Sequence, residues 1–343
     1  MRSALDSAPS ERLPTGTAFR ADPSPLRSVA RWFVSSIASD LGLPLVVYRA
    51  LKDAPQVPSD HFERSTRNIA SDSIMRWDRW HERSLPVGRC PFVRSGERRN
   101  AMQWSGRGAN YGSREVEIEA LSRLGAHEVI EDFSGDAADI GCLDVSTSPL
   151  DSISSLDDMA TVRSPELVTE VSQAKLEENV AHEGCRGLFS GNDAVIDRFA
   201  WDGRLAWRNS DGSHHFAAAR YIAGRLEKSL PIRATLNAYN LDADAVAELD
   251  REYRVFLVDE RSARSGDLAD AMRSFRATYL VADLPFPHEG LTAFFLPRDE
   301  FRARQVGKAM DETGQFDLGR FLRDQCRRQR GTSLVEGRGH AEG

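Results

Sequence analysis

The stretch WRNSDGSHHFAAARYIAGRL, residues 207–226, decides the fold that we expect for this chain. A strand-like run ends in a turn, and an alanine-rich segment with apolar residues at helical spacing follows it. Gly212 allows the backbone to turn tightly just before this helix. The first N–H groups of a helix have no intrahelical partner, so here they are directed at whatever occupies the turn.

The turn has the chemistry of an anion site, because the free N–H groups and the positive end of the helix dipole both favour negative charge. Ser213 adds a hydroxyl, and His214 and His215 can transfer protons, bind phosphate when charged, or ligate a metal. Asp211 can orient a histidine, hold a divalent cation or cap the helix. The alternative is purely structural, with a capping aspartate, a turn glycine and a histidine on the surface.

A helix is predicted before this turn, over residues 164–184. Ser164 is the expected N-cap, Pro165 the first helical residue, and Gly184 the residue just beyond the helix. Three glutamates on or near this helix are candidate acid or base partners for the turn. They are Glu177, Glu178 and Glu183.

A hairpin is predicted over residues 194–209, around Asp202-Gly203, a dipeptide preferred in type I′ turns. Residues 139–153 favour a short strand that enters a turn, and residues 230–239 favour a strand after the alanine-rich helix. Downstream, helices and strands alternate as helix 242–253, strand 254–260, helix 266–281, strand 291–297 and helix 298–312.

The predicted fold class is therefore α+β, with a mixed sheet covered by helices. An amphipathic helix is expected over residues 25–39, and residues 55–115 are not placed in a fold. The expected organisation is a disordered tail 1–24, an Arg- and Trp-rich region 25–137 of unknown fold, a domain 138–240, an α/β extension 241–330 and a disordered tail 331–343.

The segment DGSHHFAAA and the order of elements around it resemble the ParB/sulfiredoxin-like fold, over about residues 138–240 or about 30% of the chain. Many members of that fold contact a nucleotide through a box that reads approximately D-G-x-H-R before an alanine-rich helix. Ser213 stands where sulfiredoxins carry the attacking cysteine, which argues against sulfinic acid reductase activity. His215 replaces an arginine that contacts phosphate, and histidine is weaker and pH-dependent in that role.

The resemblance implies a nucleotide- or phosphate-binding protein, with NTPase, phosphotransferase and nuclease activity as options and Mg²⁺ accompanying the nucleotide. The alternative is a non-catalytic interaction protein, such as a host or conjugation inhibitor, that keeps the fold. The catalytic candidates are Asp211, His214, His215 and Glu178; the phosphate-binding candidates are Gly212, Ser213, His214 and His215; and Asp211 is the candidate metal ligand.

Composition narrows the class of protein. The chain has 343 residues, a net charge of −7 and no apolar run that could cross a bilayer, and its N-terminus lacks the apolar core of a secretory signal. A cytoplasmic protein without a membrane partner is expected. Its cysteines show no zinc-like spacing, which favours reduced thiols. They are Cys90, Cys142, Cys185 and Cys326.

Charge is unevenly distributed along the chain. Residues 1–127 carry a net charge of +5, and residues 128–166 carry −9, which favours a solvated face or linker in the second segment. Two basic segments are candidate contacts with DNA or other phosphates, although a solvated surface is the simpler interpretation of each. They are SGERRNAM, residues 95–102, and GRFLRDQCRRQR, residues 319–330.

Overall fold

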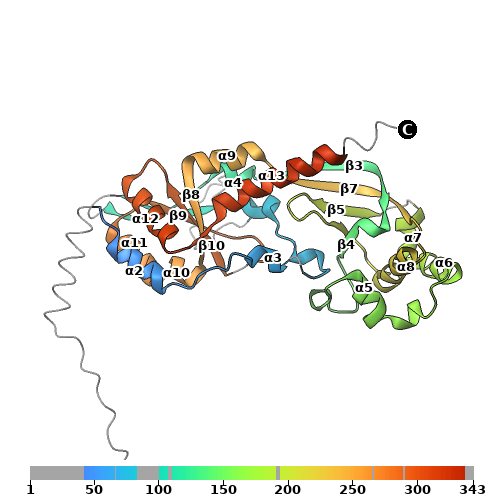
Figure 1. Cartoon of the computed structure of the whole chain (residues 1–343). Helices are drawn as coiled ribbons and strands as arrows, with labels where there is room; N and C mark the ends of the chain where they lie inside the picture. Colours follow the sequence, from blue (N-terminus) through green and yellow to red (C-terminus); the bar gives the residue numbers. More distant parts are fainter. Residues whose placement is uncertain are drawn as a thin grey trace, which may run out of the picture.

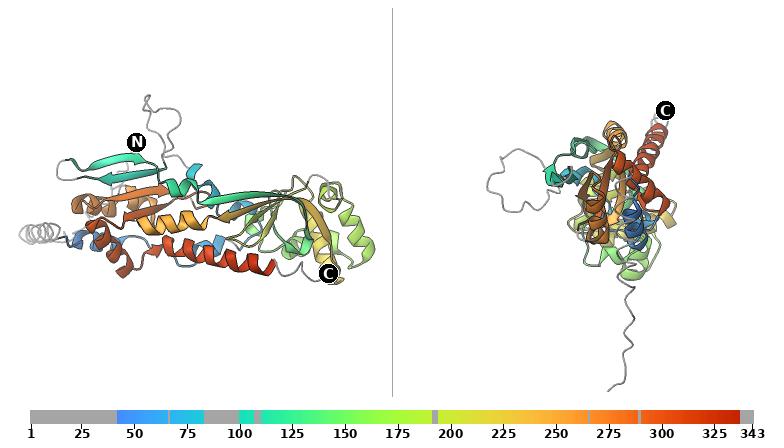
Figure 2. Two further views of the ribbon diagram at one scale, coloured as in Figure 1. Left: turned by 90° about the horizontal axis from the view of Figure 1, so that it is seen from above. Right: turned by 90° about the vertical axis from the view of Figure 1, so that its left-hand side faces the viewer.

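The chain forms two β-sheets that lie one after the other along an elongated molecule, as the computed structural model shows in Figures 1 and 2. Helices cover both sheets, which confirms the α+β class. The described residues are 42–65, 67–82, 100–106, 110–190, 194–264, 266–288 and 290–336. The expected tail 1–24 and helix 25–39 lie outside them.

The five-stranded sheet is mixed. Its strand order is β3 (Gly125–Asp136), β7 (Pro231–Leu241), β5 (Val195–Phe199), β6 (Leu205–Trp207) and β4 (Ile140–Leu143). Strand β7 runs antiparallel to β3 and parallel to β5, while β6 runs antiparallel to β5 and parallel to β4.

Helix α8 (Ser213–Arg225) covers one face of this sheet. Phe216 and Ala217 of α8 belong to the same buried cluster as Ile196 of β5 and Leu236 of β7. Alanines on α8 allow the helix to approach the sheet closely, and a strand directs alternate side chains toward it. Two further helices, α6 (Gln173–Val180) and α7 (Glu183–Ser190), lie beside α8 at the same end of the molecule.

The six-stranded sheet is antiparallel in every neighbouring pair. Its order is β11 (Phe316–Asp317), β8 (Tyr253–Asp259), β10 (Leu291–Pro297), β9 (Tyr279–Asp283), β1 (Ala101–Ser105) and β2 (Gly112–Val116). Phe256 and Val258 belong to the buried cluster on one face, and Val255 and Leu257 to the cluster on the other.

Helices pack on both faces of the six-stranded sheet. One cluster joins the sheet to α2 (Leu45–Asp53), α11 (Asp267–Phe275) and α12 (Phe301–Glu312). The other joins it to α4 (Glu119–Ser122), α9 (Ala243–Glu252) and the long helix α13 (Leu318–Glu336). Within the described part of the chain, no helix combines the length and the apolar character needed to cross a bilayer.

The sheets do not follow the segment boundaries expected from the sequence. Strands β1 and β2, from the segment of unknown fold, complete the sheet that β8 to β11 form. Strand β3, from the same segment, pairs along its length with β7. Strand β1, within residues 55–115, therefore finds one of its two neighbours, β9, in the C-terminal part of the chain.

The prediction of one continuous helix over residues 164–184 is wrong, because the chain forms separate helices in this range. Pro165–Val168 is a 3₁₀ helix, and α6 begins only after Ser172, whose hydroxyl accepts a hydrogen bond from the N–H of Lys175. Gly184 lies inside α7 and does not end a helix. Ser164 makes no capping bond, because its hydroxyl is engaged elsewhere.

The hairpin β5–β6 is confirmed, but the expected turn type is wrong. Its loop spans residues 200–204, and Gly203 has a positive φ of 86° whereas Asp202 does not. A type I′ turn needs a positive φ at both central residues. The Asp202 carboxylate instead accepts hydrogen bonds from the Arg204 guanidinium, the shortest at 2.6 Å.

Two other expected limits are corrected. Helix α11 ends at Phe275, because Arg276 takes a left-handed φ of 54°. The last residues of the predicted helix 266–281 belong instead to strand β9. Helix α13 extends to Glu336, so the first six residues of the expected tail 331–343 are helical.

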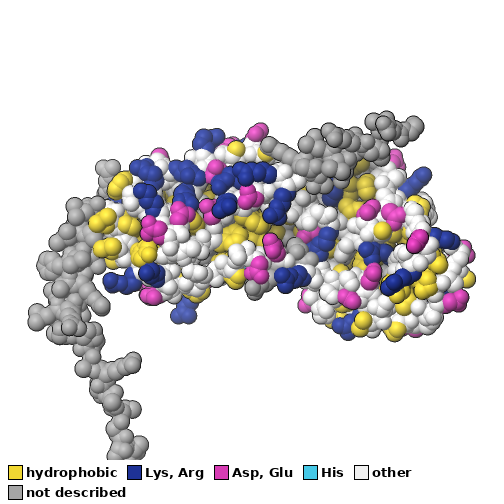
Figure 3. Space-filling view, viewed as in Figure 1, with side chains coloured by type: hydrophobic (Ala, Val, Ile, Leu, Met, Phe, Trp, Pro, Cys, Tyr) yellow, Lys and Arg dark blue, Asp and Glu magenta, His cyan; other side chains and the backbone are white. Residues whose placement is uncertain are grey.

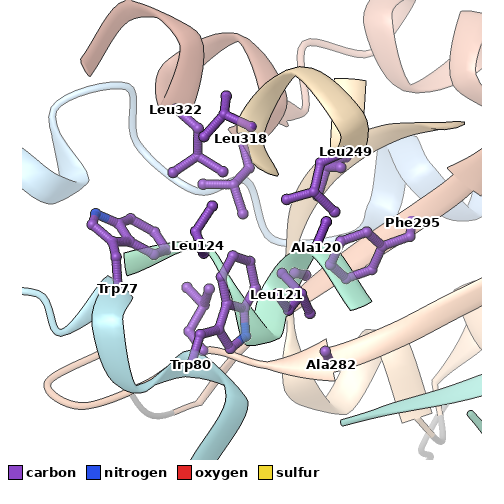
Figure 4. Close-up of a cluster of buried hydrophobic side chains, with 14 of the residues drawn as sticks. Trp77, Trp80, Ala120, Leu121, Leu124, Leu249, Ala282, Phe295, Leu318 and Leu322 are labelled. Carbon is purple, nitrogen blue, oxygen red and sulfur yellow. The ribbon is translucent and has the colours of Figure 1, made fainter. Parts of the chain in front are cut away.

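A buried cluster lies where the two sheets meet, and Figure 4 shows part of it. Leu121 and Leu124 project from α4 and its C-terminal end toward Trp80, whose indole N–H donates to the Asp283 carbonyl at 2.8 Å. Leu121 has no exposed surface. Tertiary packing of this kind holds short elements such as α4 in place.

We expect Leu121→Ala to lower the free energy of unfolding by about 2–5 kcal/mol, because it removes buried methyl groups and leaves a cavity. The matched control is Val129→Ala on β3, whose side chain is 52% exposed and whose loss should cost less than about 1 kcal/mol. Urea unfolding followed by circular dichroism measures both. Equal losses would contradict this account of the junction.

Candidate functional site

The N-terminus of α8 begins at a glycine in the left-handed region. Gly212 is the N-cap residue with φ 75° and ψ 7°, and no side chain caps the helix. Asp211 is exposed, and its carbonyl, not its carboxylate, accepts a hydrogen bond from Asn209 at 3.2 Å. The interpretation of Asp211 as a helix cap is therefore wrong.

The backbones of two helix N-termini touch at this point. A Cβ atom on Gly212 would lie 2.6 Å from the carbonyl carbon of Gly184, and one on Gly184 would lie 2.6 Å from the nitrogen of Gly212. The Cys185 thiol donates to the Gly212 carbonyl at 3.3 Å, and burial raises the pKa of this thiol to about 12. Neither glycine position has room for a side chain.

His214 is surrounded by hydroxyl groups. Its Nδ1 shares a hydrogen bond with Ser164, which is fully buried. Its Nε2 lies 3.2 to 3.3 Å from the hydroxyls of Ser146, Thr147 and Ser148. One ring nitrogen forms one strong hydrogen bond, so these three hydroxyls keep hydrogen-bonding capacity for another group.

The loop that carries these hydroxyls is attached to the turn. The Asn209 amide oxygen accepts from the N–H groups of Asp144 and Val145 at 3.0 and 3.2 Å, and its nitrogen donates to the Val145 carbonyl at 2.7 Å. Ser213, which is 4% exposed, donates to Ser146 at 3.0 Å. We call the five side chains gathered here the hydroxyl cluster: Ser146, Thr147, Ser148, Ser164 and Ser213.

The protonation of His214 follows from its surroundings. Burial lowers the pKa of His214, and the negative charge of Glu166 opposes this effect without overcoming it. The ring is therefore neutral near pH 7, with one nitrogen that donates and one that accepts. A neutral imidazole beside an array of hydroxyls can take up a proton when an anion binds.

His215 points to a different neighbourhood from His214. Its Nδ1 is hydrogen-bonded to the buried Asn179 amide oxygen at 3.0 Å, and its ring stacks on His182 with 3.8 Å between centroids. Burial lowers the pKa of His215, and the adjacent His182 lowers it further. Consecutive residues on a helix project about 100° apart, so α8 separates the two candidate histidines.

The candidate carboxylates lie on exposed surfaces. Glu178 pairs with Lys175 at 2.8 Å, Glu177 accepts from Gln173 at 2.8 Å, and Glu183 is exposed in the first turn of α7. In the described part of the chain, no group of three or more His, Cys, Asp or Glu side chains is placed to hold a metal ion. Asp211, the candidate metal ligand, is therefore not part of such a group.

The structure describes part of the first basic segment and most of the second. Residues 95–99 of SGERRNAM lie outside the described residues, and Ala101 and Met102 begin strand β1. Lys and Arg side chains gather over α9 and α13 on the face shown in Figure 3. Several arginines of α13 are paired with aspartates: Arg320 and Arg327 with Asp324, and Arg323 with Asp250.

Most of the hydroxyl cluster was missed in the sequence, where only Ser213 was a candidate. The available signal is the run of Ser and Thr residues between strand β4 and the next helical turn, in residues 146–148. Ser164 offered no such signal, because it has the sequence context of a helix cap. Its role depends on His214, fifty residues away.

A family model matches residues 130–333, which is more than half of the chain. The chain belongs to DUF6685. This is a family of unknown function, and the matched range contains the α8 turn, the loop 144–148 and strands β7 to β11. No curated protein matches the chain, and no solved structure matches it.

We expect Gly184→Ala to lower the free energy of unfolding by about 1–3 kcal/mol, because the new methyl group meets backbone atoms that cannot rotate away. The matched control is Gly224→Ala on α8, where a Cβ meets nothing within 4 Å. That change should stabilise the protein by about 0.5–1 kcal/mol. Thermal and urea unfolding of both variants measure the effects, and a neutral Gly184→Ala would refute the contact.

Proposed function

We propose that this chain binds the phosphate group of a nucleotide or a similar phosphorylated small molecule at the α8 turn. The observation that carries the proposal is the hydroxyl cluster around His214, at the start of a 13-residue helix. Hydroxyls and main-chain N–H groups are the neutral donors with which proteins bind phosphate at helix N-termini.

Main-chain donors add to the hydroxyls. The first hydrogen bond within α8 runs from the N–H of Phe216 to the Gly212 carbonyl at 2.9 Å. The N–H groups of Ser213, His214 and His215 precede this bond, so they are the unpaired donors at the start of the helix. The helix dipole places positive potential at the same end.

The resemblance to the ParB/sulfiredoxin-like fold supports a nucleotide as the ligand, since the DGSHH turn lies between a strand and a helix in the expected order. Asp211 is the residue that would hold Mg²⁺ with the nucleotide, because Mg²⁺ is often bound by one carboxylate together with phosphates and water. If the protein hydrolyses its ligand, neutral His214 is its candidate proton acceptor.

The alternative is a non-catalytic interaction protein that retains the fold. It is favoured by the environment of His215, which is held by Asn179 and His182 and so differs from a phosphate-contacting arginine. The double variant Asp211→Ala with His214→Ala separates the two functions. Unchanged biological activity of this folded variant would favour the interaction protein.

Calorimetry with ATP, CTP, GTP and ADP, with and without Mg²⁺, tests the proposal directly. We expect Ser146→Ala and His214→Gln each to weaken binding about tenfold, because the first removes a hydroxyl and the second removes the imidazole that can become positively charged. Ser190→Ala is the control, since this exposed serine of α7 donates to the Arg186 carbonyl and is not part of the hydroxyl cluster. Failure of every ligand to bind more tightly than about 1 mM would overturn the proposal.

Binding should also strengthen as the pH falls from about 8 to about 6. Burial keeps the pKa of free His214 below its usual value, and a bound phosphate stabilises the imidazolium, so binding takes up a proton. Titrations with ADP at several pH values measure this slope. The protonation of ADP itself contributes equally to the measurements on the native protein and on His214→Gln. An equal pH dependence of the affinity in the two proteins would therefore exclude His214 as the group that takes up the proton.

A further inference from the structure

The five-stranded sheet has a second face, opposite α8, that carries polar and aromatic side chains. On β5, Ile196 belongs to the cluster around α8, whereas Asp197 points to the opposite face. On β7, Leu236 belongs to that cluster, and Asn237 and Tyr239 point to the second face. This face lies away from the hydroxyl cluster.

A buried carboxylate is held on the second face by a polar network. Asn237 donates to one oxygen of Asp197 at 2.8 Å, and its own amide oxygen lies 3.2 Å from the His127 ring nitrogen. The other oxygen of Asp197 lies 3.4 Å from Arg208 Nε, which is beyond a strong hydrogen bond. Asp197 is only 5% exposed, so the fold fixes the direction of this carboxylate.

Aromatic rings make the second face rigid. The rings of His127 and Tyr239 stack with 4.6 Å between centroids, and those of Tyr239 and Phe199 stack with 5.0 Å. The Arg76 guanidinium lies about 5 Å from the Phe199 and Tyr239 rings, and Asp78 binds it through two hydrogen bonds of 2.9 and 2.6 Å. The guanidinium therefore has a fixed plane.

A cavity of about 640 Å³ opens between this face and the loop that joins β9 to β10. Asp197, Phe199 and Arg208 line it on the sheet side, and Val145 and Phe286 are 45% and 48% exposed beside them. Cavities of this size hold small-molecule ligands. Exposed apolar side chains at the opening of a polar cavity are suited to contact the faces of a ring.

We propose that this cavity is a second ligand site that takes a small planar heterocycle with a hydrogen-bond donor next to an acceptor on its edge. Asp197 presents an acceptor and Arg208 presents donors side by side, which complements an amide-like edge. Phe286 and Val145 contact the faces of the ring, and the buried Phe199 forms part of the cavity wall. Free nucleobases and nicotinamide belong to this chemical class.

The cavity and the proposed phosphate site have different lining residues. The cavity opens on the face of the five-stranded sheet opposite α8, and residues from outside that sheet line it: Ser71, Asp72, Arg76, Arg79, Pro285 and Phe286. Asp144 and Val145 also line it and precede the hydroxyls of residues 146–148 on one loop, but those hydroxyls do not line the cavity. A ligand without phosphate therefore tests the cavity alone.

Saturation-transfer NMR on the full chain with uracil, cytosine and nicotinamide tests this site. We expect at least one of them to bind, and its signal to fall by more than half in both Arg208→Ala and Phe286→Ala. Both side chains are partly exposed, at 44% and 48%, so their removal should leave the fold intact. Arg251→Ala, at an arginine on α9 that is 69% exposed, is the matched control.

Cyclohexanecarboxamide carries the same amide without a planar ring and should give no signal. The proposal is overturned if none of the three planar probes binds below about 10 mM. It is equally overturned if binding persists unchanged in Arg208→Ala and Phe286→Ala, or if cyclohexanecarboxamide binds as well as nicotinamide. Ser146→Ala should leave these signals unchanged, so failure here and failure of the phosphate site are distinguished.

Discussion

The backbone contact between Gly184 and Gly212 positions everything at the α8 end of the molecule. This contact places the first turn of α8 against the first turn of α7. The position of the first turn of α8 then determines the direction in which each of its side chains projects. One histidine therefore faces the hydroxyls of residues 146–148, and the next faces Asn179 on α6. Any side chain at the contact would move the helix and rearrange both neighbourhoods.

The chemistry at this turn differs from phosphate recognition by arginine. Without a ligand, buried hydroxyls and a neutral imidazole have a smaller desolvation penalty than a buried guanidinium, because they leave no unpaired charge. The cost is affinity, since hydrogen bonds between neutral groups and an anion are weaker than charge-assisted pairs. The phosphate site that we propose would therefore bind more weakly than an arginine site, and its affinity would depend on pH through His214.

Sequence reasoning identified the elements whose signals are local. Gly212 before an alanine-rich run, Asp202-Gly203 between two apolar arms and the apolar pattern of β10 each lie within a few residues of what they specify. Three features were beyond its reach because they depend on distant partners. The Ser164 hydroxyl was expected to cap a helix but bonds to His214, β1 pairs with β9, and Asp197 is buried beside Asn237. The apolar side of α13 was also not recognised in the sequence, because many arginines separate its apolar residues.

The position of β1 within its sheet also governs the order in which this chain can mature on the ribosome. Strand β1 can pair early with β2, but Met102 also pairs with Val281, so the β9 side of β1 waits for 179 further residues. At about 5–20 residues per second, this delay is about 10–40 s. Throughout that interval Trp77 and Trp80, which the finished protein encloses, have no completed core to enter. The nascent chain therefore exposes aromatic surface until its last third emerges.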